Sequence, residues 1–104
     1  MKNPAVRLSG PTLKVLKLML EKPREPLSGA EMSRQAGIGS GTLYPLLARL
    51  EQARWLRSKW EDIDPREAAR PRRRYYTLTG LGQNKANEAL RELQMPAGRL
   101  AWNS

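Results

Sequence analysis

Hydrophobic residues recur along the chain with two different spacings. The four leucines from Leu43 to Leu50 stand at positions i, i+3, i+4 and i+7, which is the spacing of one face of an α-helix. Residues 73–79, RRYYTLT, alternate instead, so that Tyr76 and Leu78 fall together on one side of an extended strand. The pattern therefore predicts helices and strands side by side in one small fold.

The first half of the chain predicts a pair of helices. Residues 12–22, TLKVLKLMLEK, are apolar on more than one side, which favours a central core helix; the alternative is that a partner subunit also covers its far side. The prolines of PREP, residues 23–26, end this helix. Ser28 and Glu31 then have the spacing of a capping box, which opens a second helix running to about Ala36.

A third helix and a β-hairpin follow. The turn GIG at residues 37–39 precedes the leucine-striped helix, which is predicted from Ser40 or Thr42 to about Ala53. Two short helices joined by a glycine turn are typical of a helix-turn-helix. The next segment, WLRSKW at residues 55–60, alternates and is predicted to pair with RRYYTLT across a long charged tip.

The hairpin leads into a fourth helix. Thr79 can cap its start, and Pro96 and Gly98 are expected to end it. This order of elements predicts a mainly α fold with a small β-hairpin, the winged helix-turn-helix. Its parts are a flexible basic N-terminal lead-in at 1–10, the winged domain at 11–80, and a short C-terminal dimerisation helix with its tail at 81–104.

Composition narrows the chemistry. The 104 residues include 19 basic and 10 acidic side chains, a formal net charge of +9, which predicts attraction to a polyanion such as nucleic acid. Cysteine and histidine are absent, which excludes thiolate chemistry, cysteine-bound zinc and the usual general base. No metal site and no enzyme is expected. Because neither a signal peptide nor a membrane span is visible, a cytoplasmic protein is expected.

Two segments carry a resemblance to a known family. GTLYPLLARLE at residues 41–51 and RPRRRYYTLTGLG at residues 70–82 resemble the PadR-like transcriptional regulators, bacterial dimeric winged-helix proteins. The resemblance extends from about Leu13 to Leu93. It implies that the third helix enters the major groove of DNA, that the wing lies along the backbone or minor groove, and that the last helix dimerises.

The resemblance also assigns roles position by position. The groove-facing candidates are Ser40, Gly41, Thr42, Tyr44, Pro45 and Arg49, and the wing candidates are Arg70, Arg72, Arg73, Arg74 and Tyr75. Three of these leave an alternative open. Thr42 can also be a helix cap, and Tyr44 can pack against the second helix. Arg74 shares a strand face with Tyr76 and Leu78, so it can brace the wing rather than touch DNA.

Apolar residues beyond the needs of the core indicate a homodimer. The first and last helices offer more apolar surface than one small core can use. The dimerisation candidates are Leu13, Leu16, Leu20, Leu81, Ala89, Leu90 and Leu93. No cofactor is expected, but some members of the family bind flat aromatic ligands between tryptophans. A small aromatic effector near Trp102 is therefore the alternative to simple packing of the tail.

One position departs from the family pattern. Arg54 stands where the family usually has the glycine that ends the recognition helix. A left-handed residue other than glycine costs roughly 1 kcal/mol, which favours a different helix end here. Trp55 and Trp60 are interpreted as packing residues of the wing.

The sequence thus predicts a sequence-specific regulator of transcription that binds double-stranded DNA, with a repressor favoured. As a homodimer it would bind a palindromic or pseudopalindromic operator in the cytoplasm, associated with the nucleoid. The alternatives are a basic module that docks on an acidic protein and a non-specific nucleic-acid-binding protein of the nucleoid or of RNA.

Overall fold

The computed structural model of the chain describes the backbone of residues 6–103 and the side chains of residues 6–93. The elements, in chain order, are α1 (Gly10–Glu21), β1 (Leu27–Ser28), α2 (Gly29–Ala36), α3 (Ser40–Gln52), β2 (Leu56–Trp60), α4 (Pro65–Ala68), β3 (Arg74–Leu78) and α5 (Gly80–Asn103). The predicted fold class, a mainly helical winged helix-turn-helix, is confirmed.

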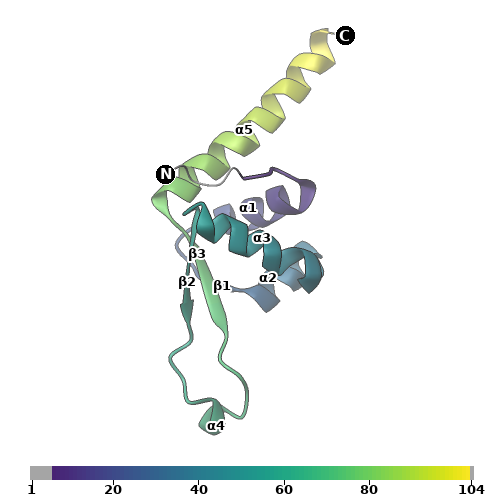
Figure 1. Ribbon diagram of the computed structural model, residues 1–104. Coiled ribbons are helices and arrows are strands. Elements are labelled where there is room, and N and C mark those ends of the chain that lie inside the picture. Colours follow the sequence, from purple (N-terminus) through teal and green to yellow (C-terminus); the bar gives the residue numbers. More distant parts are fainter. Residues whose placement is uncertain (1–5, 104) are drawn as a thin grey trace.

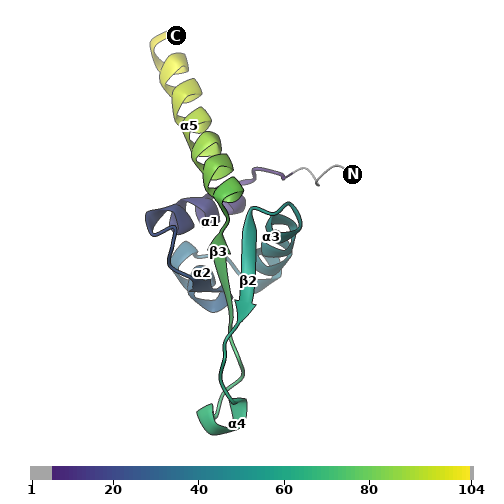
Figure 2. The same cartoon turned by 90° about the vertical axis from the view of Figure 1, so that its left-hand side faces the viewer.

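The molecule has two projections on opposite sides of a helical body. Helices α1, α2 and α3 form the body, and β2 and β3 run out of it as the wing, with α4 at the tip (Figure 1). Helix α5 leaves the body at the other end, as the view turned by 90° also shows (Figure 2). The wing and α5 therefore present two separate surfaces.

The leucine stripe of α3 lies at the centre of the core. Leu43, Leu46, Leu47 and Leu50 are at most 2% exposed. Residues from every part of the body form one cluster with them: Val15, Leu16 and Met19 of α1, Met32 of α2, Ile38 of the turn before α3, Leu56 of β2, Tyr76 and Leu78 of β3, and Ala86 of α5. Burial of apolar surface contributes roughly 25 cal/mol per Å², so this stripe fixes which face of α3 points outward.

The sheet has three strands: the predicted hairpin of β2 and β3 is confirmed, and β1 adds a strand that the sequence reasoning missed. Strand β1 pairs antiparallel with β3, in the order β1–β3–β2, with Leu27 opposite Tyr76. A strand of two residues is too short to show alternation, and Ser28 also serves as the cap of α2. The predicted capping box is confirmed, since the Glu31 amide donates to Ser28 Oγ over 3.1 Å and the Ser28 amide donates to Glu31 Oε1 over 3.2 Å.

The helices differ from the prediction in three ways: the start of α1, the end of α5 and the presence of α4. Helix α1 begins at Gly10, where the lead-in was expected, because Ser9 caps it by accepting from the Thr12 amide. The charged tip contains the short helix α4, which begins after the cap Asp64. Helix α5 continues to Asn103 and passes through Pro96 and Gly98, which were expected to end it. A proline inside a helix removes one helical hydrogen bond and can bend the helix without ending it.

Arg54 ends α3 in the left-handed conformation, so the expectation of a different helix end was wrong. Its φ is 67°. The Arg54 amide donates to the Glu51 carbonyl over 3.0 Å, and the Trp55 amide donates to the Leu50 carbonyl over 2.9 Å. These two bonds form a Schellman motif, which satisfies carbonyls at the helix end. Helix α3 thus ends in the left-handed conformation that favours glycine although its residue there is arginine.

Thr79 joins the end of the wing to the start of α5. Its hydroxyl accepts from the Gly82 amide over 2.9 Å, which confirms the predicted cap, and donates to the Arg54 carbonyl over 2.6 Å. Gly82 packs so closely on the backbone of Trp55 that an added Cβ would lie 1.9 Å from the Trp55 carbonyl oxygen. Only glycine allows this approach, which sets the direction in which α5 leaves the body.

Replacing Arg54 by glycine should stabilise the protein. The left-handed backbone at this position costs an arginine roughly 1 kcal/mol more than a glycine, so Arg54→Gly should raise the free energy of unfolding by about that amount. Urea denaturation measures the change. The control is Ala53→Gly, where φ is −78°. That variant should be less stable than the original, and equal effects of the two changes would contradict the helix end described here.

Candidate nucleic-acid interface

The outer face of α3 is open along its length. The leucines are buried on the inner side, so the residues between them are turned outward. All six groove-facing candidates are exposed, namely Ser40, Gly41, Thr42, Tyr44, Pro45 and Arg49. Ala48 and Gln52 are exposed on the same helix and were missed by the sequence reasoning. Each lies three residues after a predicted candidate, Ala48 after Pro45 and Gln52 after Arg49, and this helical spacing was the available signal.

The start of α3 leaves polar groups available to a ligand. The cap residue is Gly39, which has no side chain to accept from the first helical amides. Thr42 is not the cap, because its amide donates to the Gly39 carbonyl over 3.1 Å. Unpaired amides at a helix N-terminus attract anionic groups. The hydroxyls of Ser40 and Thr42 lie on exposed residues beside these amides.

Tyr44 packs against the second helix, which was one predicted alternative, and also remains exposed on the outer face of α3. Its ring lies on Gly29, the first residue of α2, where an added Cβ would lie 2.6 Å from Tyr44 Oη. The side chain is nevertheless 46% exposed. The contact therefore fixes the direction of the ring without covering it, and joins the start of α2 to the outer face of α3.

The wing arginines divide into two pairs. Arg70 and Arg74 are held by carboxylates. Arg70 donates from both terminal nitrogens to Glu61 over 2.7 and 2.8 Å, which closes the base of the wing tip. The Arg70 hydrogen bonds outweigh desolvation and lower the pKa of Glu61 from 4.5 to about 2. The same carboxylate accepts from the Arg73 amide over 3.2 Å, so it anchors both strands of the hairpin.

Arg74 bonds inward to α3. Its Nε donates to Ser58 Oγ over 2.9 Å, and its terminal nitrogen donates to Glu51 Oε1 over 3.2 Å. Ser58 in turn donates to Glu51 Oε2 over 2.5 Å. The Arg74 guanidinium also lies 5.5 Å from the centre of the Trp60 ring. This geometry favours the alternative that Arg74 braces the wing against the helix.

Arg72 and Arg73 form the open pair. Both are exposed. The Nε of Arg72 donates to the Ile63 carbonyl over 3.0 Å, and among the described residues its terminal nitrogens make no hydrogen bond. Within the residues described, the Arg73 side chain has no hydrogen-bond partner and no carboxylate within 4.0 Å. Guanidinium groups placed in this way can hold phosphates.

These residues border a common hollow. It is lined by Ser28, Gly29, Ala30, Tyr44, Trp60, Arg72, Arg73, Arg74 and Tyr76. The hollow thus brings together α3, the first turn of α2 and the wing arginines. Trp60 also lines it and is 57% exposed, so its packing within the wing, against Arg74, covers only part of the ring. Trp55 is partly buried against the core, as predicted.

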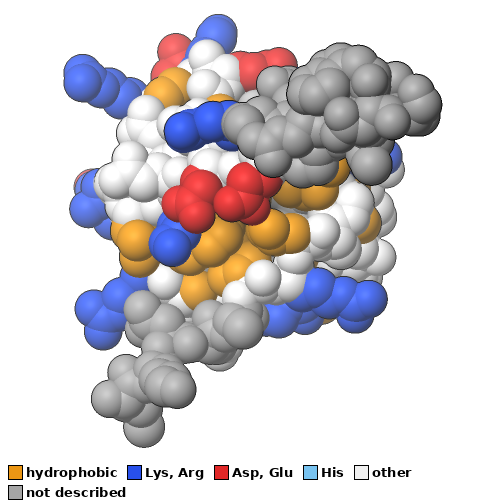
Figure 3. Space-filling model, turned by 90° about the horizontal axis from the view of Figure 1, so that it is seen from above, with side chains coloured by type: hydrophobic (Ala, Val, Ile, Leu, Met, Phe, Trp, Pro, Cys, Tyr) orange, Lys and Arg blue, Asp and Glu red, His pale blue; other side chains and the backbone are white. Residues whose placement is uncertain are grey.

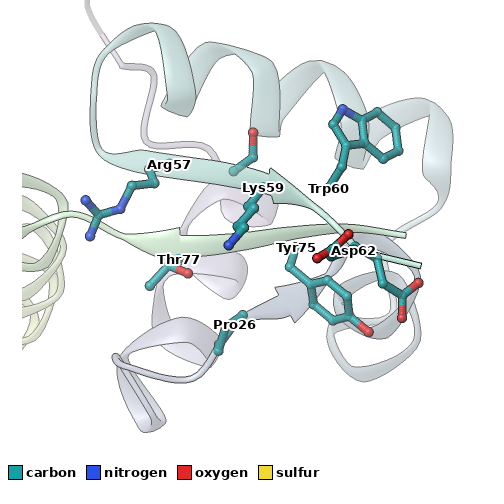
Figure 4. A pocket seen from close by; sticks show the side chains of 9 residues that line it. Pro26, Arg57, Lys59, Trp60, Asp62, Tyr75 and Thr77 are labelled. Atoms are coloured by element: carbon teal, nitrogen blue, oxygen red, sulfur yellow. The ribbon is translucent and has the colours of Figure 1, made fainter. Parts of the chain in front are cut away.

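Tyr75 lies on the other face of the sheet, away from this hollow. It stands opposite Lys59 in the register of β2 and β3, while Arg74 stands opposite Trp60. Figure 4 shows Tyr75 and Trp60 on opposite sides of the strands. A second hollow on the Tyr75 side is lined by Pro26, Arg57, Ser58, Lys59, Trp60, Glu61, Asp62, Tyr75 and Thr77. The structure therefore does not bring Tyr75 together with the other candidates.

The dimerisation candidates are exposed to different degrees. Leu16 is fully buried in the core of one chain and Ala89 is 7% exposed, so neither offers much surface. Leu81 and Leu93 on α5 are 41% and 55% exposed. Seen from the α5 side, hydrophobic side chains form a continuous area (Figure 3). The Trp102 side chain, and with it the suggested effector site, lies outside the described side chains.

Two kinds of feature are absent from the described part of the chain, helices able to span a membrane and clusters of metal ligands. None of its helices is both long and apolar enough to cross a membrane. Its acidic side chains form no group of three that could hold a metal ion. What the geometry offers is hydrogen-bond donors and cations on one face, which suits the binding of an anionic polymer.

Comparison with known proteins identifies the family and supports the fold. Residues 15–88 match the family model "Transcriptional regulator PadR-like family". A solved structure from Streptococcus mutans UA159 is similar, with TM-score 0.71 and 22% identity over 96% of this chain and 91% of that one. A PadR-like transcriptional regulator of Bacillus cereus has TM-score 0.68 and 20% identity over 86% of each chain.

A further similar structure is the adhesin competence repressor AdcR of Streptococcus pyogenes, with TM-score 0.65 and 19% identity over 95% of this chain and 68% of that one. At these identities the three structures show the fold alone. A comparison with curated proteins found no match.

Proposed function

The chain belongs to the PadR-like family, whose members are transcriptional regulators and not enzymes, and we propose that it represses transcription by binding a specific duplex sequence as a homodimer. The outer face of α3 would lie in the major groove. Arg72 and Arg73 would hold phosphates of the adjacent backbone. The protein would act in the cytoplasm, on the DNA of the nucleoid.

One observation carries the proposal: the exposed side of α3 and the two open arginines border the same hollow. A major groove admits a helix, and the phosphates flanking it attract cations. The wing extends well beyond α3 (Figure 2), so its arginines can reach phosphates outside the groove that α3 would enter. The net charge of +9 adds a long-range attraction to the polyanion.

A homodimer would give this surface its two-fold repeat. The exposed apolar side chains of α5, Leu81 and Leu93, support α5 as the contact between subunits, since it projects away from the wing. Half-sites in the operator would then be centred about 10 base pairs apart or a multiple of that. Because the dimer would bury α5, the residues of the α3 surface would stay free for DNA.

Specific binding should be detectable on the DNA upstream of the protein's own gene. A gel shift of that fragment should survive an excess of random duplex, because base contacts add to the phosphate contacts. If random duplex competes equally, the protein is a non-specific nucleic-acid binder. If neither duplex binds even at low salt, a basic module for an acidic protein partner replaces the proposal.

Wing and helix variants should lose affinity in different ways. Arg72→Ala or Arg73→Ala should weaken binding to operator and random duplex alike, and should lower the slope of log K against log salt by roughly one unit per lost phosphate contact. Thr42→Ala or Tyr44→Phe should cost roughly 1–3 kcal/mol on the operator and much less on random duplex.

The matched control for the wing is Arg57→Ala, which removes an exposed arginine from the opposite face of the sheet. It should change the affinity far less than Arg72→Ala. An equal loss in Arg57→Ala, or a loss confined to the operator in Arg72→Ala, would show that the wing has been assigned wrongly.

The dimer can be tested by sedimentation at tens of micromolar protein. We expect a dimer for the original chain and a shift towards monomer for Leu93→Glu, which places a charge on the exposed apolar surface of α5. Lys85→Glu, at another exposed position of α5, is the control and should remain dimeric. A monomeric original chain would contradict the two-fold operator as well.

A further inference from the structure

Trp60 is a large aromatic side chain left in solvent at the base of the wing. It is 57% exposed, the highest exposure among the large hydrophobic side chains described. The side chains before it on the same strand face, Leu56 and Ser58, are buried and half-buried. The core and α3 therefore support this face only as far as Ser58, and Trp60 extends beyond them.

The ring of Trp60 is held in position despite its exposure. Arg74 is its cross-strand neighbour, and the Arg74 guanidinium lies 5.5 Å from the ring centre. That guanidinium is itself fixed by Ser58 and Glu51, over 2.9 and 3.2 Å. A cation against an aromatic face is a favourable contact. One face of the ring is thus occupied by protein, and the rest is available to a ligand.

The surroundings of Trp60 favour an anionic ligand on one side of the sheet. The hollow that Trp60 shares with Tyr44 contains three arginines and no acidic residue. The hollow on the other face contains Arg57 and Lys59 but also Glu61 and Asp62, so its formal charges cancel. Charge complementarity therefore directs a polyanion to the side of Tyr44, Arg72 and Arg73.

A DNA strand presents two chemistries to such a hollow. Its phosphates are anionic, and the deoxyribose rings between them are largely apolar. Arg72 and Arg73 match the phosphates, whereas an exposed indole matches a sugar. Burial of exposed aromatic surface against the sugar would remove it from water, which is favourable in proportion to its area.

We propose that Trp60 is a DNA-contacting residue whose indole packs against a deoxyribose of the strand held by Arg72 and Arg73. The inference rests on the proposed function and adds a contact that the family resemblance did not assign. It places the aromatic contact of the wing at Trp60, on β2, in place of Tyr75, on β3. The two rings point to opposite faces of the sheet, and Arg72 and Arg73 line the hollow that contains Trp60 and not Tyr75.

The first test compares Trp60→Ala with Tyr75→Ala on random duplex and on the fragment upstream of the protein's own gene. Loss of an apolar contact of this size should weaken binding to both duplexes about tenfold in Trp60→Ala. The dependence of the affinity on salt should keep its slope, because no phosphate contact is lost. Trp60→Phe should recover part of the loss, and Tyr75→Ala should bind like the original chain.

The second test detects the contact directly and does not depend on how well the alanine variant folds. Binding of duplex should change the tryptophan fluorescence of the original chain, and Trp60→Phe should abolish most of that change. Trp55 and Trp102 are present in both proteins. An unaltered fluorescence change in Trp60→Phe, or a loss of affinity in Tyr75→Ala in place of Trp60→Ala, overturns the inference.

A purely structural role would show a different pattern. If Trp60 served only to hold Arg74, the salt slope would fall together with the affinity, and the fluorescence of Trp60 would not respond to duplex. If the original chain binds no duplex, the proposed function itself fails. If the original chain binds duplex and Trp60→Ala binds equally well, only the inference about Trp60 fails.

Discussion

The bonds of Arg74 to Ser58 and Glu51 connect the wing to α3, and the arrangement of the proposed DNA-binding surface depends on them. Exposed ion pairs contribute little to stability, typically up to about 1 kcal/mol, and this pair is partly exposed. Its importance is geometric. Two side chains of the sheet converge on one carboxylate of α3, with bonds of 2.5 to 3.2 Å. A wing without this connection could swing relative to the helix.

Two further contacts extend the same surface. The Tyr44 ring lies on Gly29 and so holds the first turn of α2 beside the outer face of α3. Glu61 accepts from Arg70 and from the Arg73 amide, which keeps the hairpin closed where the open arginines begin. The arginines of the arginine-rich segment therefore have two different roles. Arg70 and Arg74 use their charge to build the wing, which leaves Arg72 and Arg73 to meet an anion.

The spacing of hydrophobic residues predicted those helices and strands that are long enough to contain a full repeat. The leucine stripe gave the orientation of α3, and alternation placed Tyr76 and Leu78 in the core. Strand β1 and helix α4 span two and four residues, too few for a period, and β1 also depends on a partner distant in sequence, β3. Tyr75 is a different case, because two lines of sequence reasoning disagreed about its position. Alternation already placed it opposite to Tyr76, but the family resemblance assigned it to DNA. The exposure of Trp60 depends on where the core ends, which alternation does not reveal.

The central claim is that α3 and the wing form one surface for duplex DNA while the other face of the sheet stays free. Nuclear magnetic resonance of the labelled protein, titrated with the fragment upstream of its own gene, tests this most directly. The account predicts that side-chain signals of Thr42, Tyr44, Arg72 and Arg73 shift together, while those of Arg57, Lys59 and Thr77 stay unchanged. Shifts confined to the Arg57 face, or to the wing without α3, would contradict it.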